Sequence, residues 1–237
     1  MPKSGAVRTT REGSVATITL ANGSDNLLDP VVMNALHDAI SAADEDREIL
    51  AIVLAADGER FCGGLDVAEL QRGGDPAEFA TALVKLLKLL PRIGTALVAA
   101  VHGDALASGF SIVCCCDLAV AAPQARLGTF EAGIGIWPMI AQVPPLQRML
   151  PRHALRNIIT GVPFSAAEAE RFGAITKIAA GRVRSEAREL AEAASVAGRA
   201  LAAGRRSFYR FTELPYEDAL DAALDSFTTM LSTSPNR

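Results

Sequence analysis

The hydrophobic positions of the chain form short apolar runs that alternate with longer amphipathic stretches. Four nearly continuous runs are typical of strands buried in a sheet: 15–20, 49–55, 96–101 and 118–121. The stretches between them predict helices over 30–46, 76–90 and 109–116. Asp29 is the expected N-cap of the first helix and Pro30 its first residue, while Pro91 ends the second. Strands that alternate with helices predict an α/β fold with parallel pairing.

The last third of the chain changes to helical patterns. Segments 138–150, 151–160 and 165–172 predict successive helices, and 182–203, 205–211 and 216–230 predict three more, with breaks at Gly204 and Pro215. We therefore expect an α/β core over residues 1–180 and a helical appendage over residues 181–237. The stretch 199–211 is basic and aromatic, with Arg199, Arg205, Arg206 and Arg210 beside Phe208, Tyr209 and Phe211, which favours a solvated face with an apolar packing stripe over a contact with phosphate groups.

Composition narrows the class of protein. The 237 residues are half hydrophobic and carry a net charge of −4, so we expect one well-buried core and neither a nucleic-acid nor a membrane partner. The first residues lack the apolar core of a signal peptide. Cys62, the run Cys114 to Cys116 and the three histidines have no metal-site spacing, so no metal is expected. Reduced thiols predict a cytoplasmic protein.

Two glycine-bearing turns are the most informative motifs. The first is Phe-Cys-Gly-Gly-Leu-Asp at 61–66, and the second is Gly-Asp-Ala-Leu-Ala-Ser-Gly-Phe-Ser at 103–111. Each follows an apolar run and leads into a helical pattern, which leaves unpaired backbone N–H groups at a helix start. If Asp66 caps the helix after the first turn, the N–H of Leu65 is free, and the N–H of Ser108 opens the second helix. Two such donors converging on one oxygen make an oxyanion hole, whereas either motif alone also fits an ordinary turn.

One carboxyl group follows these turns in an apolar context. Glu131 lies among Phe130, Ala132, Ile134 and Trp137, so its side chain is expected to be partly desolvated and tuned toward proton transfer. A glutamate that simply faces water is the alternative. Ser111 lies one helical turn after Ser108, where its hydroxyl can share a face with the turn or bond back to its own helix.

Taken together and in order, these motifs resemble the enoyl-CoA hydratase/isomerase (crotonase) family from about residue 15 to about residue 178. The resemblance also covers the Gly-Ile-Gly-Ile-Trp-Pro that follows Glu131. It implies a crotonase-like (ββα)-repeat spiral core with a C-terminal helical appendage. It implies an acyl-CoA thioester as substrate, with coenzyme A bound only as part of that substrate and no other cofactor. It further implies a homotrimer or hexamer assembled through residues 181–237.

The resemblance also assigns roles to residues. Leu65 and Ser108 would form the oxyanion hole through their N–H groups, Glu131 and Ser111 would be catalytic, and further positions would bind substrate: Gly64, Asp66, Gly109 and Trp137. Ser111 stands where hydratases of the family carry their other glutamate. The local sequence around Ser111 is also similar to that of hydroxycinnamoyl-CoA hydratase-lyases.

Two further departures concern coenzyme A. Asp25 stands where a basic residue often precedes the asparagine that matches Asn26, and the ending Pro235-Asn236-Arg237 lacks the family's basic tail. Three hypotheses follow from these features. The first is a 2-enoyl-CoA hydratase with Glu131 as its single acid/base, and the second is a Δ3,Δ2-enoyl-CoA isomerase. The third is a non-catalytic acyl-CoA-binding protein.

Overall fold

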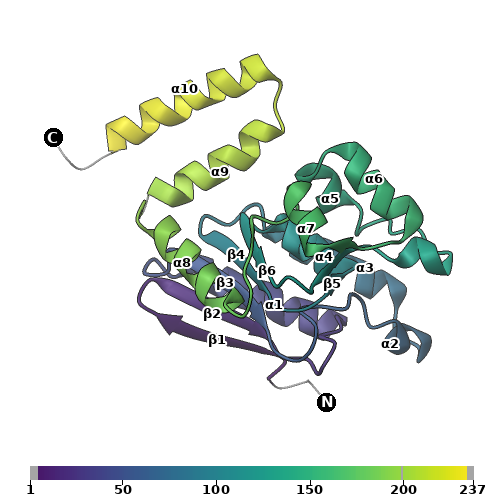
Figure 1. The fold of residues 1–237 in the computed structure, drawn as a ribbon. Helices are drawn as coiled ribbons and strands as arrows, with labels where there is room; N and C mark the ends of the chain where they lie inside the picture. Colours follow the sequence, from purple (N-terminus) through teal and green to yellow (C-terminus); the bar gives the residue numbers. More distant parts are fainter. Residues whose placement is uncertain (1–4, 199, 234–237) are drawn as a thin grey trace.

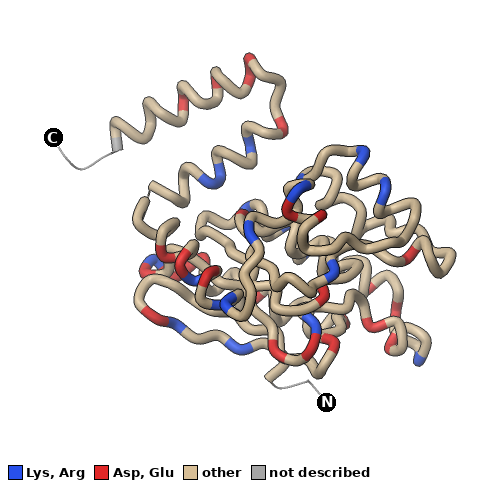
Figure 2. Tube along the Cα trace, in the orientation of Figure 1, with Lys and Arg blue, Asp and Glu red and all other residues tan. Residues whose placement is uncertain are grey.

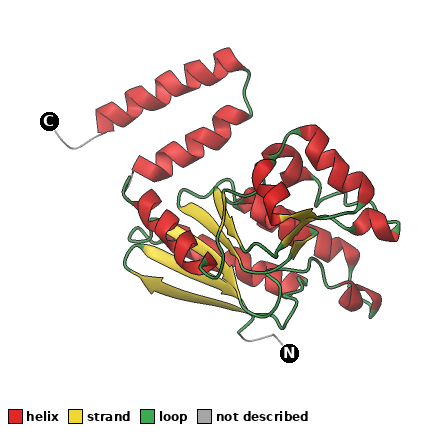
Figure 3. Cartoon of the chain, in the orientation of Figure 1, coloured by secondary structure: helices red, strands yellow, loops and turns green. Residues whose placement is uncertain are grey.

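The chain folds as a mixed α/β structure built on two sheets, seen here in a computed structural model that describes residues 5–198 and 200–233. The larger sheet has the strand order β1-β2-β3-β4-β6-β9, and the smaller has the order β5-β7-β8 (Figures 1 and 3). The strands are β1 Val7–Glu12, β2 Val15–Leu20, β3 Ala51–Ala56, β4 Ala96–Val101, β5 Ala105–Leu106, β6 Leu118–Ala121, β7 Arg126–Gly128, β8 Phe164–Ser165 and β9 Lys177–Ile178. The helices are α1 Pro30–Glu45, α2 Val67–Gln71, α3 Pro76–Leu89, α4 Ser108–Cys115, the 3₁₀ turn η1 Glu131–Ile134, α5 Val143–Arg148, α6 Pro151–Thr160, α7 Ala166–Arg171, α8 Val183–Ser195, α9 Ala200–Thr212 and α10 Tyr216–Thr233.

The chain repeats one path several times. It passes along a strand of the large sheet, then along a short strand or bridge of the small layer, and then into a helix. This path runs β4–β5–α4 and β6–β7–η1, and β3 leads in the same way to Cys62, which forms a parallel bridge with Ala105. All pairings from β2 to β9 in the large sheet are parallel. The predicted (ββα) repeat with parallel strands is therefore confirmed.

The central strands are apolar because helices or the second layer cover both of their faces. Every residue of β3 and β4 is buried, as expected for parallel strands without a solvent face. The capping prediction for the first helix also holds, because the Asp29 side chain accepts a hydrogen bond from the N–H of Val32 at 2.8 Å. No helix among the described residues is both long and apolar enough to cross a membrane.

Three helix predictions need correction. The segment predicted as a helix over 138–150 is helical only in α5, Val143–Arg148, because its first residues form turns around Trp137. The segment predicted as one helix over 182–203 is broken at Gly198, whose φ of +57° belongs to the left-handed region that ends helices. Gly204, predicted as a break, lies inside α9.

The N-terminal strand β1 was missed because its sequence, VRTTRE, carries no apolar alternation. It pairs antiparallel with β2 at the edge of the large sheet, where a solvent-exposed strand needs few apolar residues. β5, β7, β8 and β9 are too short for periodicity to reveal them.

The helices that follow the predicted boundary at residue 180 differ in how they pack. α8 packs on the large sheet and buries Val183, Ala187 and Ala191, so it continues the core. α9 and α10 instead extend from the body (Figure 1), and α10 exposes a row of apolar side chains: Leu220, Leu224, Phe227 and Leu231. The boundary itself stays a prediction, and residues 235–237, whose sequence lacks the family's basic tail, lie outside the described residues.

Candidate active site

The three predicted site elements leave the fold at the same end of neighbouring parallel segments. Cys62 bridges Ala105, and Ala105 pairs with Leu127 in β7, so three segments lie side by side with the same direction. The chain reaches Leu65 three residues after Cys62 and Ser108 three residues after Ala105. Glu131 follows Leu127 after four residues. The topology therefore brings both predicted N–H donors and the predicted carboxyl group to one edge.

The first turn holds the Leu65 N–H free of the fold. The neighbouring groups are used, because Gly64 O accepts from Leu28 N at 2.8 Å and Asp66 N donates to Leu28 O at 2.9 Å. Within the described residues the Leu65 N–H itself has no acceptor. Asp66 caps α2 by accepting from Glu69 N at 2.9 Å, as predicted. Gly64 makes the turn possible with a φ of +99°.

The second turn presents Ser108 in the same way. Ala107 N donates to Gly128 O at 2.9 Å and Ala107 O accepts from Ser111 N at 3.1 Å, which fixes the residue before Ser108. Ser108 is the first residue of α4, and its N–H has no acceptor in the described part of the chain. Gly109 is needed for close packing, since a Cβ there would lie 2.5 Å from Cys62 O.

The two turns touch each other. A Cβ built on Gly64 would lie 3.7 Å from the nitrogen of Ser108 and 2.8 Å from the Cβ of Ala107. Two backbone donors with no internal acceptor therefore lie on turns in direct contact, one of them at a helix N-terminus whose dipole favours negative charge. This arrangement suits a developing oxyanion.

Glu131 begins the 3₁₀ turn η1 and is half-buried. Burial raises the pKa of its carboxyl group, and the N–H groups of Glu131 and Phe130 oppose that rise. The Phe130 N–H donates to Glu131 Oε2 at 2.8 Å. A carboxyl group with a raised pKa exchanges protons near neutral pH more readily than an exposed one, which suits general acid/base work.

Ser111 is fully buried in α4. Its hydroxyl lies 2.8 Å from Ala141 O and 3.3 Å from Ala107 O, so its single proton is directed to backbone carbonyls. It thereby ties the second turn to the loop that follows η1. That loop carries Trp137, whose side chain is 45 % exposed and whose Nε1 donates to Gln142 Oε1 at 3.1 Å.

Asp25, which stands in place of a basic residue, has a cationic partner in the structure. Arg60 Nη1 lies 3.4 Å from Asp25 Oδ1 and 3.6 Å from the position that a Cβ on Gly63 would take. A cation therefore stands beside the first turn although the residue before Asn26 is acidic. The signal in the sequence was Arg60 itself, two residues before Cys62.

The cysteines take no part in this chemistry. Burial raises the pKa of the Cys62 thiol to about 12 and that of Cys115 to about 12, so both stay protonated at neutral pH. Among the described residues no group of His, Cys, Asp and Glu side chains is arranged to hold a metal ion.

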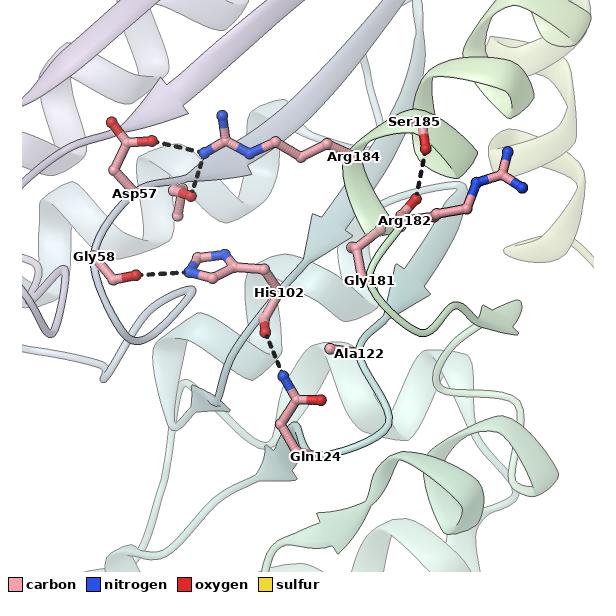
Figure 4. Close-up of a pocket in the computed structure, with 11 residues that line it drawn as sticks. Asp57, Gly58, His102, Ala122, Gln124, Gly181, Arg182, Arg184 and Ser185 are labelled. Carbon is pink, nitrogen blue, oxygen red and sulfur yellow. Dashed lines mark hydrogen bonds and ion pairs between the residues drawn. The ribbon is translucent and has the colours of Figure 1, made fainter.

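A hollow of about 790 Å³ lies elsewhere, at the start of α8 (Figure 4). None of the predicted site residues lines it. The guanidinium of Arg184 in its wall is bonded to Ala56 O at 2.6 Å and to Asp57 at 2.7 Å, and Arg182 pairs with Glu189 at 3.1 Å. The charges of this wall are therefore neutralised within the protein.

Comparisons with known proteins identify the family of the chain. The family model described as Enoyl-CoA hydratase/isomerase matches residues 10–236. The chain is 31 % identical over 188 residues to "Crotonyl-CoA hydratase" of Syntrophomonas wolfei, an alignment that covers 74 % of this chain and 70 % of the relative. It is 34 % identical over 168 residues to "Peroxisomal bifunctional enzyme" of Danio rerio, covering 70 % of this chain but 23 % of that protein. The chain thus spans about a quarter of the length of that relative.

Solved structures show the same fold. A crystal structure of enoyl-CoA hydratase from Mycobacterium smegmatis superposes with a TM-score of 0.92 at 27 % identity, covering 98 % of this chain and 93 % of that one. An enoyl-CoA hydratase/isomerase family protein from Silicibacter pomeroyi gives 0.91 at 26 % identity, covering 97 % and 100 %. The chain belongs to the enoyl-CoA hydratase/isomerase family. The predicted family of enzymes and the predicted crotonase-like fold are confirmed.

Proposed function

We propose that the chain hydrates a 2-enoyl-CoA thioester, with Glu131 as its single acid/base. The observation that supports the proposal is that two acceptor-free N–H groups, Leu65 and Ser108, and a half-buried carboxyl group lie at the same end of three paired segments. The names of the relatives above support the substrate class. The backbone donors supply what such a thioester needs, which is a place for negative charge on its oxygen.

In the proposed reaction one residue, Glu131, both accepts and returns the proton. The Glu131 carboxylate takes a proton from water as the water oxygen bonds to C3 of the enoyl group. The C2=C3 electron pair moves toward the thioester carbonyl, and the Leu65 and Ser108 N–H groups bind the resulting enolate oxygen. The protonated Glu131 then returns its proton to C2, so that H and OH have been added across the double bond.

Ser111 enters the proposal through the position of its hydroxyl. Because the proton of Ser111 is directed to Ala141 O, the proton transfers are assigned to Glu131. Ser111 supports them by holding the loop after η1 against α4. Its predicted catalytic role stays a prediction that Ser111→Ala tests.

Isomerisation is the second candidate, because a single carboxyl group is enough for it. Glu131 would remove a proton from C2 of a 3-enoyl-CoA and return it to C4, with the same enolate on the same N–H groups. The serine at position 111, in place of a second carboxyl group, favours this reaction as much as it favours single-residue hydration.

The deciding experiment is incubation with a panel of 2-enoyl-CoA and 3-enoyl-CoA thioesters in ¹⁸O-labelled water, read by mass spectrometry. Hydration predicts ¹⁸O in a 3-hydroxyacyl-CoA product. A shifted double bond without label would establish isomerisation instead. Binding of every thioester without any product would refute both reactions and favour a non-catalytic acyl-CoA-binding protein.

Glu131→Gln and Glu48→Gln form a matched pair for this assay. Glu48 is an exposed carboxylate just before β3, at the opposite end of the parallel strands. Turnover should be lost in Glu131→Gln and kept in Glu48→Gln. Full turnover by Glu131→Gln on every substrate of the parent chain would refute the assignment.

We further propose that the chain assembles as a homotrimer or a dimer of trimers through α9 and α10. The exposed apolar row of α10 supports this assembly. All charged side chains of α10 are acidic, as Figure 2 shows: Glu217, Asp218, Asp221 and Asp225. The exposed face of α6 combines Leu155 and Ile159 with Arg152, so it offers a surface of matching chemistry on another copy.

A further inference from the structure

One buried amide engages every polar group of Thr129, the residue two positions before Glu131. Asn157 of α6 and Thr129 are both fully buried. Asn157 Oδ1 accepts from Thr129 N at 2.8 Å and from Thr129 Oγ1 at 2.9 Å. Asn157 Nδ2 donates to Thr129 O and to Val162 O, each at 2.9 Å. The amide therefore uses its two donor and two acceptor positions, and only one orientation of the group satisfies them.

Backbone contacts on both sides reinforce this pairing. A Cβ on Gly128, whose φ is +150°, would lie 2.7 Å from Asn157 Nδ2, so the glycine allows the amide to reach the strand end. A Cβ on Gly161 would lie 2.5 Å from Gly133 N and 2.9 Å from Phe130 O. The C-terminal end of α6 is thus pressed against the turn that begins at Glu131.

We infer that Asn157 is a positioning residue for Glu131, which it serves through Thr129. Thr129 is the last residue before Phe130 and Glu131, and Phe130 N–H binds the Glu131 carboxylate directly. With the backbone of Thr129 fixed at its N–H and its C=O, the start of η1 has one conformation. This inference deepens the proposed function, on which its catalytic part rests.

The charged surroundings of Glu131 do not offer another explanation for its setting. The cationic candidates on α6 are Arg152, His153 and Arg156; Arg156 pairs with Glu168 of α7 at 3.0 Å. None of these contributes to the raised pKa of Glu131, whose causes are burial and two backbone N–H groups. The position of the turn, which sets that burial, is therefore the relevant variable.

The test compares Asn157→Leu with Ile158→Ala. Ile158 is the next residue of α6 and equally buried, but it has no bond to Thr129, so its variant controls for a general loss of packing. Thr129→Val removes only the hydroxyl bond and serves if Asn157→Leu does not fold. The Glu131 carboxyl is followed by ¹³C NMR in glutamate-labelled protein, assigned by Glu131→Gln, and turnover is measured on the substrate identified above.

In Asn157→Leu the pH at the midpoint of the Glu131 titration should move down toward that of an ordinary glutamate. The value of kcat should fall by roughly a hundredfold, with KM changed less than about threefold. Thr129→Val should give a smaller shift in the same direction. Ile158→Ala should keep the parent midpoint and kcat. A folded Asn157→Leu, or Thr129→Val in its place, with the parent midpoint and kcat would overturn the inference, and so would equal losses in Ile158→Ala. A parent chain without turnover would refute the proposed function, while the NMR midpoints would still decide the role of Asn157.

Discussion

The methyl group of Ala107 occupies the space in which a side chain on Gly64 would have to begin. The Cβ of Ala107 lies 2.8 Å from the ideal Cβ position of Gly64, and a Cβ there would also lie 3.3 Å from Leu106 O. The two turns that carry the free N–H groups are therefore in van der Waals contact through one methyl group. The distance between the two turns therefore depends on Ala107, although its side chain has no polar group that could bind a ligand.

Gly64→Ala should disable the site. The new methyl group would meet Ala107 and would require a φ of +99° from an alanine, at a cost of about 1–3 kcal/mol in the free energy of unfolding. Displacement of the Leu65 donor should lower kcat by about 10²–10³-fold. Gly73→Ala is the control, because Gly73 has a φ of +108° with nothing within 4 Å of its Cβ position. If Gly73→Ala loses as much activity as Gly64→Ala, the loss is not specific to the turn.

Ala107→Gly should stabilise the protein. Ala107 has φ and ψ of +51° and −121°, a conformation that an alanine rarely adopts. Relief of that strain should outweigh the extra flexibility of glycine in the unfolded chain and raise the free energy of unfolding by about 1 kcal/mol. Ala105→Gly, in the neighbouring strand β5, should instead lower it, as denaturant titration would measure. Equal destabilisation by both variants would contradict the strain argument.

The stability of the protein should depend on the charge of Glu131. Its pKa is raised by burial, so at pH values between the unfolded and the folded pKa the folded state holds a proton that the unfolded state has released. The free energy of unfolding therefore falls as pH rises from the unfolded pKa through the folded one. Glu131→Gln should remove this part of the pH dependence and be more stable than the parent chain at neutral pH, with the advantage vanishing in acid. Parallel curves for the two proteins would show that the carboxyl group is not desolvated.

Arg205→Ala should strongly destabilise the fold. The Arg205 side chain is 4 % exposed, and its Nε donates to Asp117 Oδ2 at 2.7 Å while its other nitrogens donate to the carbonyls of Leu90 and Ile93. Loss of the guanidinium leaves the mostly buried Asp117 carboxylate without its cation, with only Tyr209 OH and Leu97 N as donors among the described residues, at a cost of about 3–5 kcal/mol. Arg206→Ala removes an exposed ion pair with Asp44 and should cost less than about 1 kcal/mol. If calorimetry gave similar losses of stability for Arg205→Ala and Arg206→Ala, the result would argue against a buried network around Arg205.

Light scattering should find a trimer or hexamer that Leu224→Glu dissociates. Leu224 is 64 % exposed on the apolar row of α10, where a carboxylate would prevent burial against another copy. Asp225→Asn changes charge on a different face of the same helix and should leave the assembly intact. A parent chain that is cleanly monomeric would exclude this use of α10.

The sequence predicts the strands that are buried on both faces, because an apolar run can be recognised without knowledge of its partners. It also predicts the Asp29 and Asp66 caps, which are local interactions. β1 could not be found, because an edge strand needs no apolar pattern. The prediction of a solvated face for the stretch 199–211 was wrong for Arg205, which is buried. A basic residue in an amphipathic helix gives no sign of a partner such as Asp117, 88 positions away.

Asn157 was missed for a related reason, although the sequence holds a signal. Asn157 follows Ala154 by three positions and precedes Ile158, which places a polar side chain on the buried face of α6. A polar group in such a place must find partners. The identity of its partner, Thr129, depends on how α6 returns to β7 and could come only from the structure.

Both proposed oxyanion donors are main-chain N–H groups, so the side chains of the same two residues take no part in binding the oxyanion. Ser108 and Leu65 can be exchanged for other residues as long as the three segments at Cys62, Ala105 and Leu127 stay in register. Evolution can therefore alter the lining of such a pocket residue by residue without dismantling its anion-binding part. The backbone thus keeps the anion-binding function, and specificity can change through side chains at separate positions such as 111 and 137.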